Sequence, residues 1–337
     1  DGDLVAGEAG SVNAAGGGAS ATNDAEASGS GNVANAGNDD IFTDDGNDTI
    51  SGGVLAAGVA ALAAIDNTAT ASGDATAEAS AGDDTIDAAD GANVVAGDAL
   101  TTGDYGTADS DNDATATDGA TASAGSDIIS AEDGDDIVSG DALATGDYGV
   151  ANATNTSSAS SNASAGSDTI TAGEGNNVVA GDAAATGVGG TISILNEATA
   201  GAGESHSGDD SITTGNGNDV IAGEGGAQGD ASATNRATTT GPAGSANAGN
   251  DTITAGDETN WTGDGDNVVS GGVGSLYGNA TLTNEADVSD YGGTARAGND
   301  EVRTGTGNDA IAGEALVFDT SLGGDAEANN TATATAG

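Results

Sequence analysis

The stretch Thr214-Gly215-Asn216-Gly217-Asn218-Asp219-Val220-Ile221 decides the fold of this chain. Glycine adopts positive φ at no steric cost, so successive carbonyl groups of such a turn can face one centre. The Asp two residues after the second Gly adds a carboxylate, and carbonyl and carboxylate oxygens are the ligands that calcium prefers. The aliphatic residue that follows anchors a strand in the core, because alternate strand positions face opposite sides. The stretch therefore predicts a cation-binding turn followed by a short buried strand.

This unit recurs along the whole chain, which has 337 residues. Segments that open with a small residue, Gly, a polar residue and Asp follow one another at spacings of 45, 43, 41, 42, 41 and 49 residues. Such self-similarity at a nearly fixed period is the signature of a solenoid. We therefore predict one continuous repeat array over residues 1–337. It consists of a partial unit, 1–35, and seven full units: 36–80, 81–123, 124–164, 165–206, 207–247, 248–296 and 297–337.

Each unit begins with two tandem nonapeptides of the form Gly, x, Asp or Asn, x, aliphatic. The predicted metal ligands of the first turns are Asp39, Asp84, Asp127, Asp168, Asp210, Asp251 and Asp300. Those of the second turns are Asp48, Asn93, Asp136, Asn177, Asp219, Asn267 and Asp309. Asn supplies an oxygen without a charge, so we expect the three Asn turns to hold calcium more weakly than the Asp turns.

These nonapeptides resemble the RTX (repeat in toxin) family, whose repeat reads Gly-Gly-x-Gly-x-Asp-x-aliphatic-x. The resemblance implies an all-β fold, a parallel β-solenoid of the β-roll or β-helix type, with about seven repeats of 41–49 residues. In the family the six residues through Asp form a turn that binds Ca²⁺, and the last three form a short parallel strand. The first nonapeptide of each unit departs from the pattern, because Ala or Ser precedes its Gly. About 18 residues per unit match the family, and the rest of each unit does not.

The remainder of each unit holds a third small box and an alternating tail. The box is Gly followed by an acid, as in Gly97-Asp98 and Gly140-Asp141, and we interpret it as an outward carboxylate that is either solvated or a further cation ligand. The tail alternates Ala with polar residues, which is typical of a strand with one shallow apolar face, although a flexible linker is the alternative. We expect one wide coil per unit, with Ile86, Ile129 and Ile170 stacked. Two narrow coils per unit remain the alternative.

We expect the wide coil to have a short side after the first turn. A longer side then runs through the aliphatic pair Val94-Val95, and the Ala alternation forms the return side.

Composition and charge exclude several classes of protein. Gly accounts for 60 residues and aromatic residues for 2%, so a thick mixed core is not available. The formal net charge is −52, which excludes nucleic acid as a partner and repels an anionic membrane surface. No stretch approaches the length of a membrane span, so we expect no membrane insertion. Cations must neutralise this charge, and calcium fits the oxygen-rich composition.

An enzymatic function is not expected from these residues. The one His, His206, lies in a Gly/Ser-rich segment, and the abundant carboxylates fall in predicted calcium turns. Trp261 and the matching Gly-Asp-Tyr-Gly segments at Tyr105 and Tyr148 fit either a sugar-binding face or loop corners packed on the coil, and we favour the corners.

The sequence thus favours a secreted, extracellular or cell-surface structural protein, stabilised by calcium, that forms a shaft, filament or surface-layer segment. The alternatives are a ligand-binding solenoid, as an ice binder or glycan adhesin, and an RTX module of a larger secreted enzyme. Neither end of the sequence completes a unit, so we also expect end-to-end self-association or continuation in a longer chain.

Overall fold

The protein is described by a computed structural model. The structure describes residues 4–12, 18–28, 33–72, 78–117, 121–241, 244–255, 268–275, 279–289, 294–304, 310–317 and 326–334. All regular structure in these residues is β-strand. No helix in the described part of the chain is long and apolar enough to cross a membrane.

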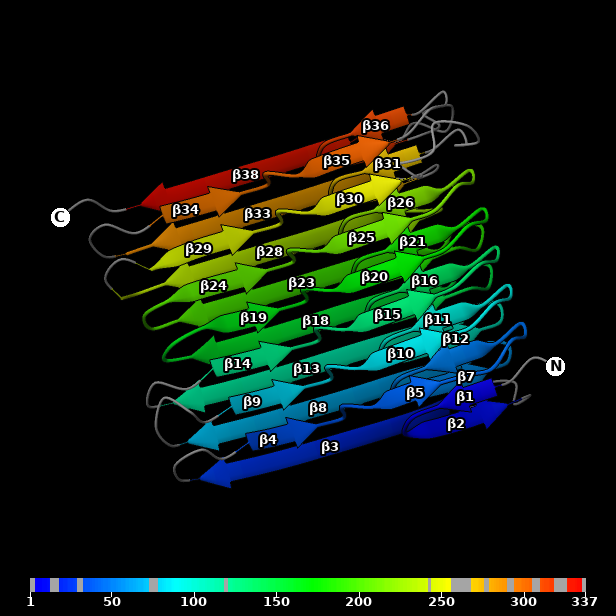
Figure 1. Ribbon diagram of the computed structural model, residues 1–337, viewed down its shortest axis with the longest axis horizontal. Helices are drawn as coiled ribbons and strands as arrows, with labels where there is room; N and C mark the ends of the chain where they lie inside the picture. The colour runs from blue at the N-terminus through cyan, green and yellow to red at the C-terminus, as the bar shows by residue number, and fades with distance from the viewer. Residues whose placement is uncertain are drawn as a thin grey trace.

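Each repeat forms one coil of five strands, and each strand pairs in parallel with its equivalents in the neighbouring coils (Figure 1). Two of the five sheets follow from the nonapeptides. The sheet of the first nonapeptide contains β5 (Asp40–Phe42), β10 (Thr85–Ala88), β15 (Ile128–Ala131), β20 (Thr169–Ala172), β25 (Ser211–Thr214), β30 (Thr252–Ala255) and β35 (Glu301–Thr304). The sheet of the second contains β1 (Leu4–Ala6), β6 (Thr49–Ser51), β11 (Val94–Ala96), β16 (Ile137–Ser139), β21 (Val178–Ala180), β26 (Val220–Ala222), β31 (Val268–Ser270) and β36 (Ala310–Ala312).

The other three sheets come from the rest of each repeat. The sheet that follows the third box contains β2 (Ala9–Val12), β7 (Val54–Ala57), β12 (Ala99–Thr102), β17 (Ala142–Ala144), β22 (Ala183–Ala185), β27 (Gly225–Ala227), β32 (Val273–Ser275) and β37 (Ala315–Val317). The sheet of long strands contains β3 (Gly18–Ser28), β8 (Leu62–Ser72), β13 (Thr107–Thr117), β18 (Val150–Ala159), β23 (Thr191–Ala200), β28 (Ala231–Thr239), β33 (Ala280–Val288) and β38 (Ala326–Ala334). The last contains β4 (Val33–Ala36), β9 (Glu78–Ala81), β14 (Thr121–Ala124), β19 (Ala163–Ala165), β24 (Glu204–Ser207), β29 (Ser245–Ala248) and β34 (Thr294–Ala297).

The pairing confirms one wide coil per repeat. Ile86 pairs with Ile129, and Ile129 pairs with Ile170, so equivalent aliphatic residues form a continuous ladder. The flexible-linker interpretation of the Ala-rich tail is wrong, because the tail forms the long strands of 9 to 11 residues. The expected order of side lengths is also wrong, because the aliphatic pair lies in strands of three residues such as β11. The Ala-rich tail forms the longest side of the coil because Ala alternates with polar residues over its whole length. Such period-two alternation favours a half-buried strand.

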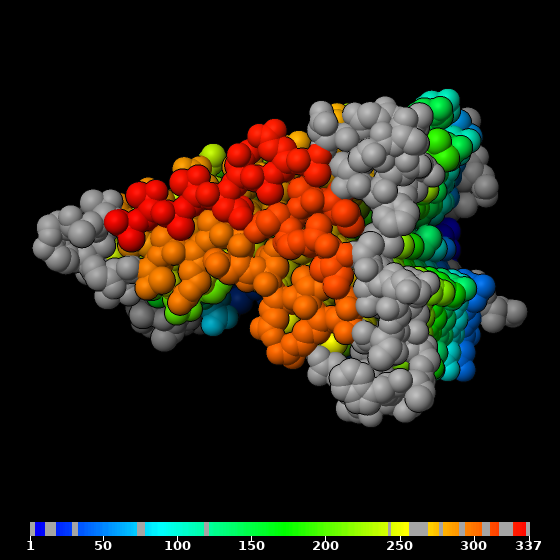
Figure 2. Space-filling model, turned by 90° about the horizontal axis from the view of Figure 1, so that it is seen from above, coloured from blue at the N-terminus to red at the C-terminus, as the bar shows by residue number. Residues whose placement is uncertain are grey.

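The core is thin and divided among the arms of the coil. Ile and Val from the two nonapeptides face one another in one cluster, which includes Ile50, Ile86 and Val95. Another cluster, in the arm of the long strands, contains only Ala, such as Ala71 and Ala116. Figure 2, which looks at the last coil from above, shows this arm at the left with β34 and β38, and notches between the arms. Ala removes little apolar surface from water, so the fold depends on ladder hydrogen bonds and on its polar interior.

Candidate metal centre

The Asp residues of the first turns form a hydrogen-bonded ladder along the solenoid. The backbone N–H of Asp39 donates to Oδ1 of Asp84, and the N–H of Asp84 donates to Oδ1 of Asp127, both at 2.6 Å. The pattern continues through Asp168, Asp210, Asp251 and Asp300 at 2.7 to 3.1 Å. Each ladder bond satisfies one carboxylate oxygen and leaves the other for a different partner.

The second oxygen of these carboxylates is buried and has no hydrogen-bond partner among the described residues. This holds for Oδ2 of Asp39, Asp84, Asp127, Asp168, Asp210 and Asp251. A buried acceptor without a donor costs about 1–3 kcal/mol, and more when it is charged. Six such oxygens in register at equivalent turns indicate a common partner, which is either a proton or a cation.

The glycine of the third box makes room for this oxygen. A Cβ on Gly97 would lie 1.9 Å from Oδ2 of Asp127 and 2.0 Å from the carbonyl oxygen of Gly140, so no other residue fits there. The same convergence occurs at Gly140, where the two atoms are Oδ2 of Asp168 and the carbonyl oxygen of Gly181. The carboxylate oxygen and the carbonyl oxygen thus lie on the same side of the Gly, an arrangement that suits a shared cation.

Four of the six acids of the third box point inward, which corrects the prediction of an outward carboxylate there, while Glu8 is exposed and Glu314 is partly buried. The side chains of Asp98, Asp141, Asp182 and Glu224 are fully buried. Because strand residues alternate between faces and the chain turns sharply at the Gly of the box, the acid enters the coil beside the first turn. Of the two interpretations of the box, a cation ligand fits the structure and a solvated face does not.

First-turn and third-box acids combine into three buried carboxylate clusters, in each of which the ligand oxygens lie within 4.8 Å of one another. Asp98, Asp127 and Asp141 form the first cluster. The other two are Asp141 with Asp168 and Asp182, and Asp182 with Asp210 and Glu224. Asp141 and Asp182 each belong to two clusters, so these seven acids form one continuous row, which we call the carboxylate file.

A ladder of asparagines on the long strands orients the carboxylate file. Nδ2 of Asn112 donates to Oδ1 of Asn155 at 3.0 Å and to Oδ2 of Asp98 at 2.8 Å. Nδ2 of Asn155 donates in the same way to Asn196 and to Asp141. Sequence reasoning missed this ladder, although Asn recurs near the middle of every long strand. Its members are Asn23, Asn67, Asn112, Asn155, Asn196, Asn235, Asn284 and Asn330.

Burial makes the carboxylate file favour protons when no cation is present. Desolvation raises the pKa of Asp98 and of Asp182 to about 6, even though hydrogen bonds from the Asn ladder oppose the shift. Burial followed by repulsion from neighbouring acids raises the pKa of Asp127 and Asp141 well above the ordinary value. Carboxylates that resist ionisation in the empty fold are those that a divalent cation would stabilise.

The second turns show how Asn and Asp differ. The N–H of Asp48 donates to Oδ1 of Asn93, and that of Asn93 donates to Oδ1 of Asp136, so these residues also form a ladder. Nδ2 of Asn93 and of Asn177 donates to the carbonyl four residues earlier, on Ala89 and Gly173. Oδ2 of Asp136 is buried without such a partner. An Asn turn therefore satisfies its own carbonyl, whereas Asp136 leaves an oxygen that suits a cation. At Asp219 the equivalent oxygen accepts a hydrogen bond from Oγ1 of Thr214 at 2.8 Å.

Twelve of the fourteen predicted ligands lie in described turns, while Asn267 and Asp309 lie outside the described residues, as does Trp261. Whether each one binds metal stays a prediction.

The expectation for the tyrosines is partly wrong. Tyr105 and Tyr148 do occupy corners, with φ of 60° and 55°, but they are exposed and stack on each other at a centroid distance of 5.3 Å. His206 hydrogen-bonds Asp209 at 2.8 Å, which raises its pKa.

The donor set fits calcium. Calcium takes about six to eight oxygen ligands, and the carboxylate file offers carboxylate and carbonyl oxygens with no nitrogen or sulfur. Comparison with known families finds the RTX calcium-binding nonapeptide repeat in residues 33–54, 70–99, 117–143, 161–185, 206–227 and 294–315. No curated protein and no solved structure gives a significant match. The matched repeats bind calcium, and the residues that would hold it here are the turn acids and the carboxylate file.

Proposed function

Because this chain is a β-solenoid that carries RTX calcium-binding nonapeptide repeats, we propose that it is an extracellular structural protein whose fold calcium stabilises. Its role is mechanical: a shaft, a filament or a segment of a surface layer. It acts at the cell surface or after secretion, and it is not a catalyst.

The observation that supports this proposal most strongly is the carboxylate file. Its seven buried acids run along the stack of coils in a chain with a formal net charge of −52. Ionised carboxylates in a dry interior cost several kcal/mol each unless they are paired. Bound calcium would offset this cost and join neighbouring coils, because each cluster takes its acids from two consecutive coils. In this proposal the ions link successive coils along the axis of the solenoid.

Calcium concentration supports the extracellular placement. Individual sites in extracellular modules work at calcium concentrations of about 10⁻⁴–10⁻³ M, whereas such sites would stay empty in the cytosol. A chain with this charge and few bulky apolar residues would stay unfolded where calcium is scarce and fold where calcium is abundant. Folding on arrival outside the cell follows from the same linkage.

The stacking of coils supports the structural role. Parallel strands pair in register through seven or eight coils in every sheet, so the solenoid resists bending and stretching along its length. The strands of the terminal coils expose unpaired edges, and contact between such edges is heterologous and does not close. We propose that copies of the array associate end to end.

The test combines circular dichroism with electron microscopy of the full chain. At neutral pH in chelator we expect little β-structure, and in millimolar calcium we expect the β-signal together with rods or filaments of uniform width. Equal β-content in chelator and calcium would remove the calcium requirement. Compact, monodisperse globules in calcium would refute the structural role and leave the calcium requirement intact.

A further inference from the structure

A row of residues on one side of the solenoid changes size abruptly. It runs along the sheet that follows the third box, and each member pairs directly with the next. Gly10 comes first, three leucines follow, then three small residues, then another leucine. In order, the members are Gly10, Leu55, Leu100, Leu143, Ala184, Gly226, Gly274 and Leu316.

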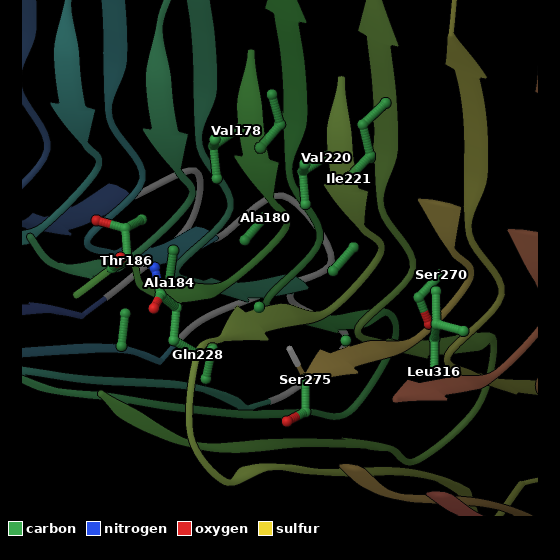
Figure 3. A pocket seen from close by; sticks show the side chains of 16 residues that line it. Val178, Ala180, Ala184, Thr186, Val220, Ile221, Gln228, Ser270, Ser275 and Leu316 are labelled. Carbon is green, nitrogen blue, oxygen red and sulfur yellow. Dashed lines mark hydrogen bonds between the residues drawn. The ribbon is translucent and has the colours of Figure 1, made fainter. Parts of the chain in front are cut away.

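The large members fill a groove between two arms of the coil, and the small members leave it open. Leu55, Leu100 and Leu143 are buried there. Beside Ala184, Gly226 and Gly274 the groove contains a pocket of about 270 Å³. Figure 3 shows this pocket, with Val178 and Val220 on one side, Gln228 on the other and Leu316 toward the C-terminal end.

The pocket glycines are not required by the backbone. A Cβ on Gly226 would meet nothing nearer than the Cβ of Ala222 at 3.9 Å, and the nearest atoms to one on Gly274 are also 3.9 Å away. Neither residue has positive φ. Gly97, in contrast, has no room for a Cβ. The effect of Gly226 and Gly274 is thus to keep space free that Leu occupies elsewhere in the row.

We propose that this pocket binds a short, uncharged aliphatic molecule, such as the alkyl chain of a neutral amphiphile. The lining is aliphatic, with Thr, Ser and Gln as its polar members and no charged residue among the lining residues. Apolar walls favour an alkyl chain, and a hydroxyl head group can hydrogen-bond to the few polar side chains of the lining. The net charge of −52 disfavours an anionic ligand such as a fatty acid.

Leucines close the pocket at both ends, which favours a small molecule over a polypeptide as its ligand. Leu143 precedes the three small residues and Leu316 follows them, four coil steps apart. At about 4.8 Å per coil the two leucines are about 19 Å apart, so the opening is shorter than the groove. A strand of a partner protein, or a second copy of this chain, would have to continue past both leucines. A molecule with one alkyl chain does not.

The test uses the full chain in saturating calcium, with N-phenyl-1-naphthylamine as a neutral fluorescent probe and decan-1-ol as competitor. We expect probe binding that decan-1-ol displaces, and decanoate, which has the same chain length and a negative charge, to compete at least tenfold less well. Gly226→Leu restores the leucine row and should weaken probe and decan-1-ol binding at least tenfold. Ser193→Leu adds the same side chain at an exposed position of β23 and should leave binding unchanged. Ala184→Leu, next to Leu143, serves as a second filling variant if Gly226→Leu does not fold.

Three outcomes would overturn the proposal. The first is no saturable binding of the probe or of decan-1-ol to the calcium-loaded protein. The second is equal binding by the wild type and by both filling variants. The third is a change in oligomeric state, measured by sedimentation, in the filling variants without any change in probe binding, which would assign the pocket to self-association. Equal competition by decanoate and decan-1-ol would refute the selection against negative charge. None of these outcomes bears on the calcium requirement, which circular dichroism measures separately.

Discussion

Replacing Asp141 by Asn tests the carboxylate file at one of the two residues that its clusters share. Asp141 is fully buried and belongs to two of the three clusters. The change keeps the size of the side chain and an oxygen for the hydrogen bond from Asn155, but removes one charge from both clusters. We expect each affected site to bind calcium about tenfold more weakly, because ligand charge tunes such sites. Tenfold is about 1.4 kcal/mol, so two sites lose about 3 kcal/mol of calcium-dependent stabilisation.

The sign of the effect should reverse in chelator. Burial and the neighbouring acids raise the pKa of Asp141 well above its ordinary value, so its ionised form destabilises the empty fold at neutral pH. Asn removes that penalty, and Asp141→Asn should stabilise whatever folded population exists without calcium. Asp147→Asn is the matched control, because Asp147 carries the same charge on an exposed turn of the same repeat. Urea unfolding followed by circular dichroism measures the first effect in calcium, and the β-signal in chelator without urea measures the second as a change in the folded fraction. Indistinguishable behaviour of the two variants in both conditions would refute the reasoning.

The remaining predictions use other parts of the site. Asp219→Ala should lower calcium affinity more than Asn177→Ala, because only the first removes an ionised ligand, and equal losses by calorimetry would contradict the assignment. Gly97→Ala should cost several kcal/mol of stability, because its Cβ would lie 1.9 Å from a carboxylate oxygen, whereas Gly226→Ala should be nearly neutral. Burial raises the pKa of Asp98 to about 6, above its unfolded value. In chelator the fold should therefore be most stable near pH 4 and lose stability as the pH rises through about 6, and a pH-independent circular dichroism signal would oppose this.

The sequence predicts the ladders of this fold well because it shows both the repeat length and the period-two alternation of the strands directly. The nonapeptide spacing places Ile86 over Ile129, and the Ala alternation gives the long strands their buried face. Both patterns depend on position along one strand or between adjacent repeats. Period-two alternation and a fixed repeat length are sufficient to derive them.

The carboxylate file could not be derived in the same way. Whether Asp98 faces solvent or the interior depends on the direction in which the chain turns after Gly97, and an acid after a Gly reads equally well as a solvated corner. Its neighbour Asn112 lies 14 residues later, on a different sheet. The recurrence of Asn in the long strands was the available signal, because a buried amide ladder needs the same residue at the same place in every coil. The change from Leu to smaller residues in the leucine row is also visible in the sequence. Only the structure shows that it opens a pocket in a groove.

The most direct test of the central claim is anomalous X-ray diffraction from crystals grown in calcium. We expect anomalous density between the carboxylates of Asp98, Asp127 and Asp141, and at the two equivalent clusters farther along the carboxylate file. Calcium found only at the second turns, with the carboxylates of the carboxylate file free of any ion at neutral pH, would contradict the claim that calcium binds inside the coil.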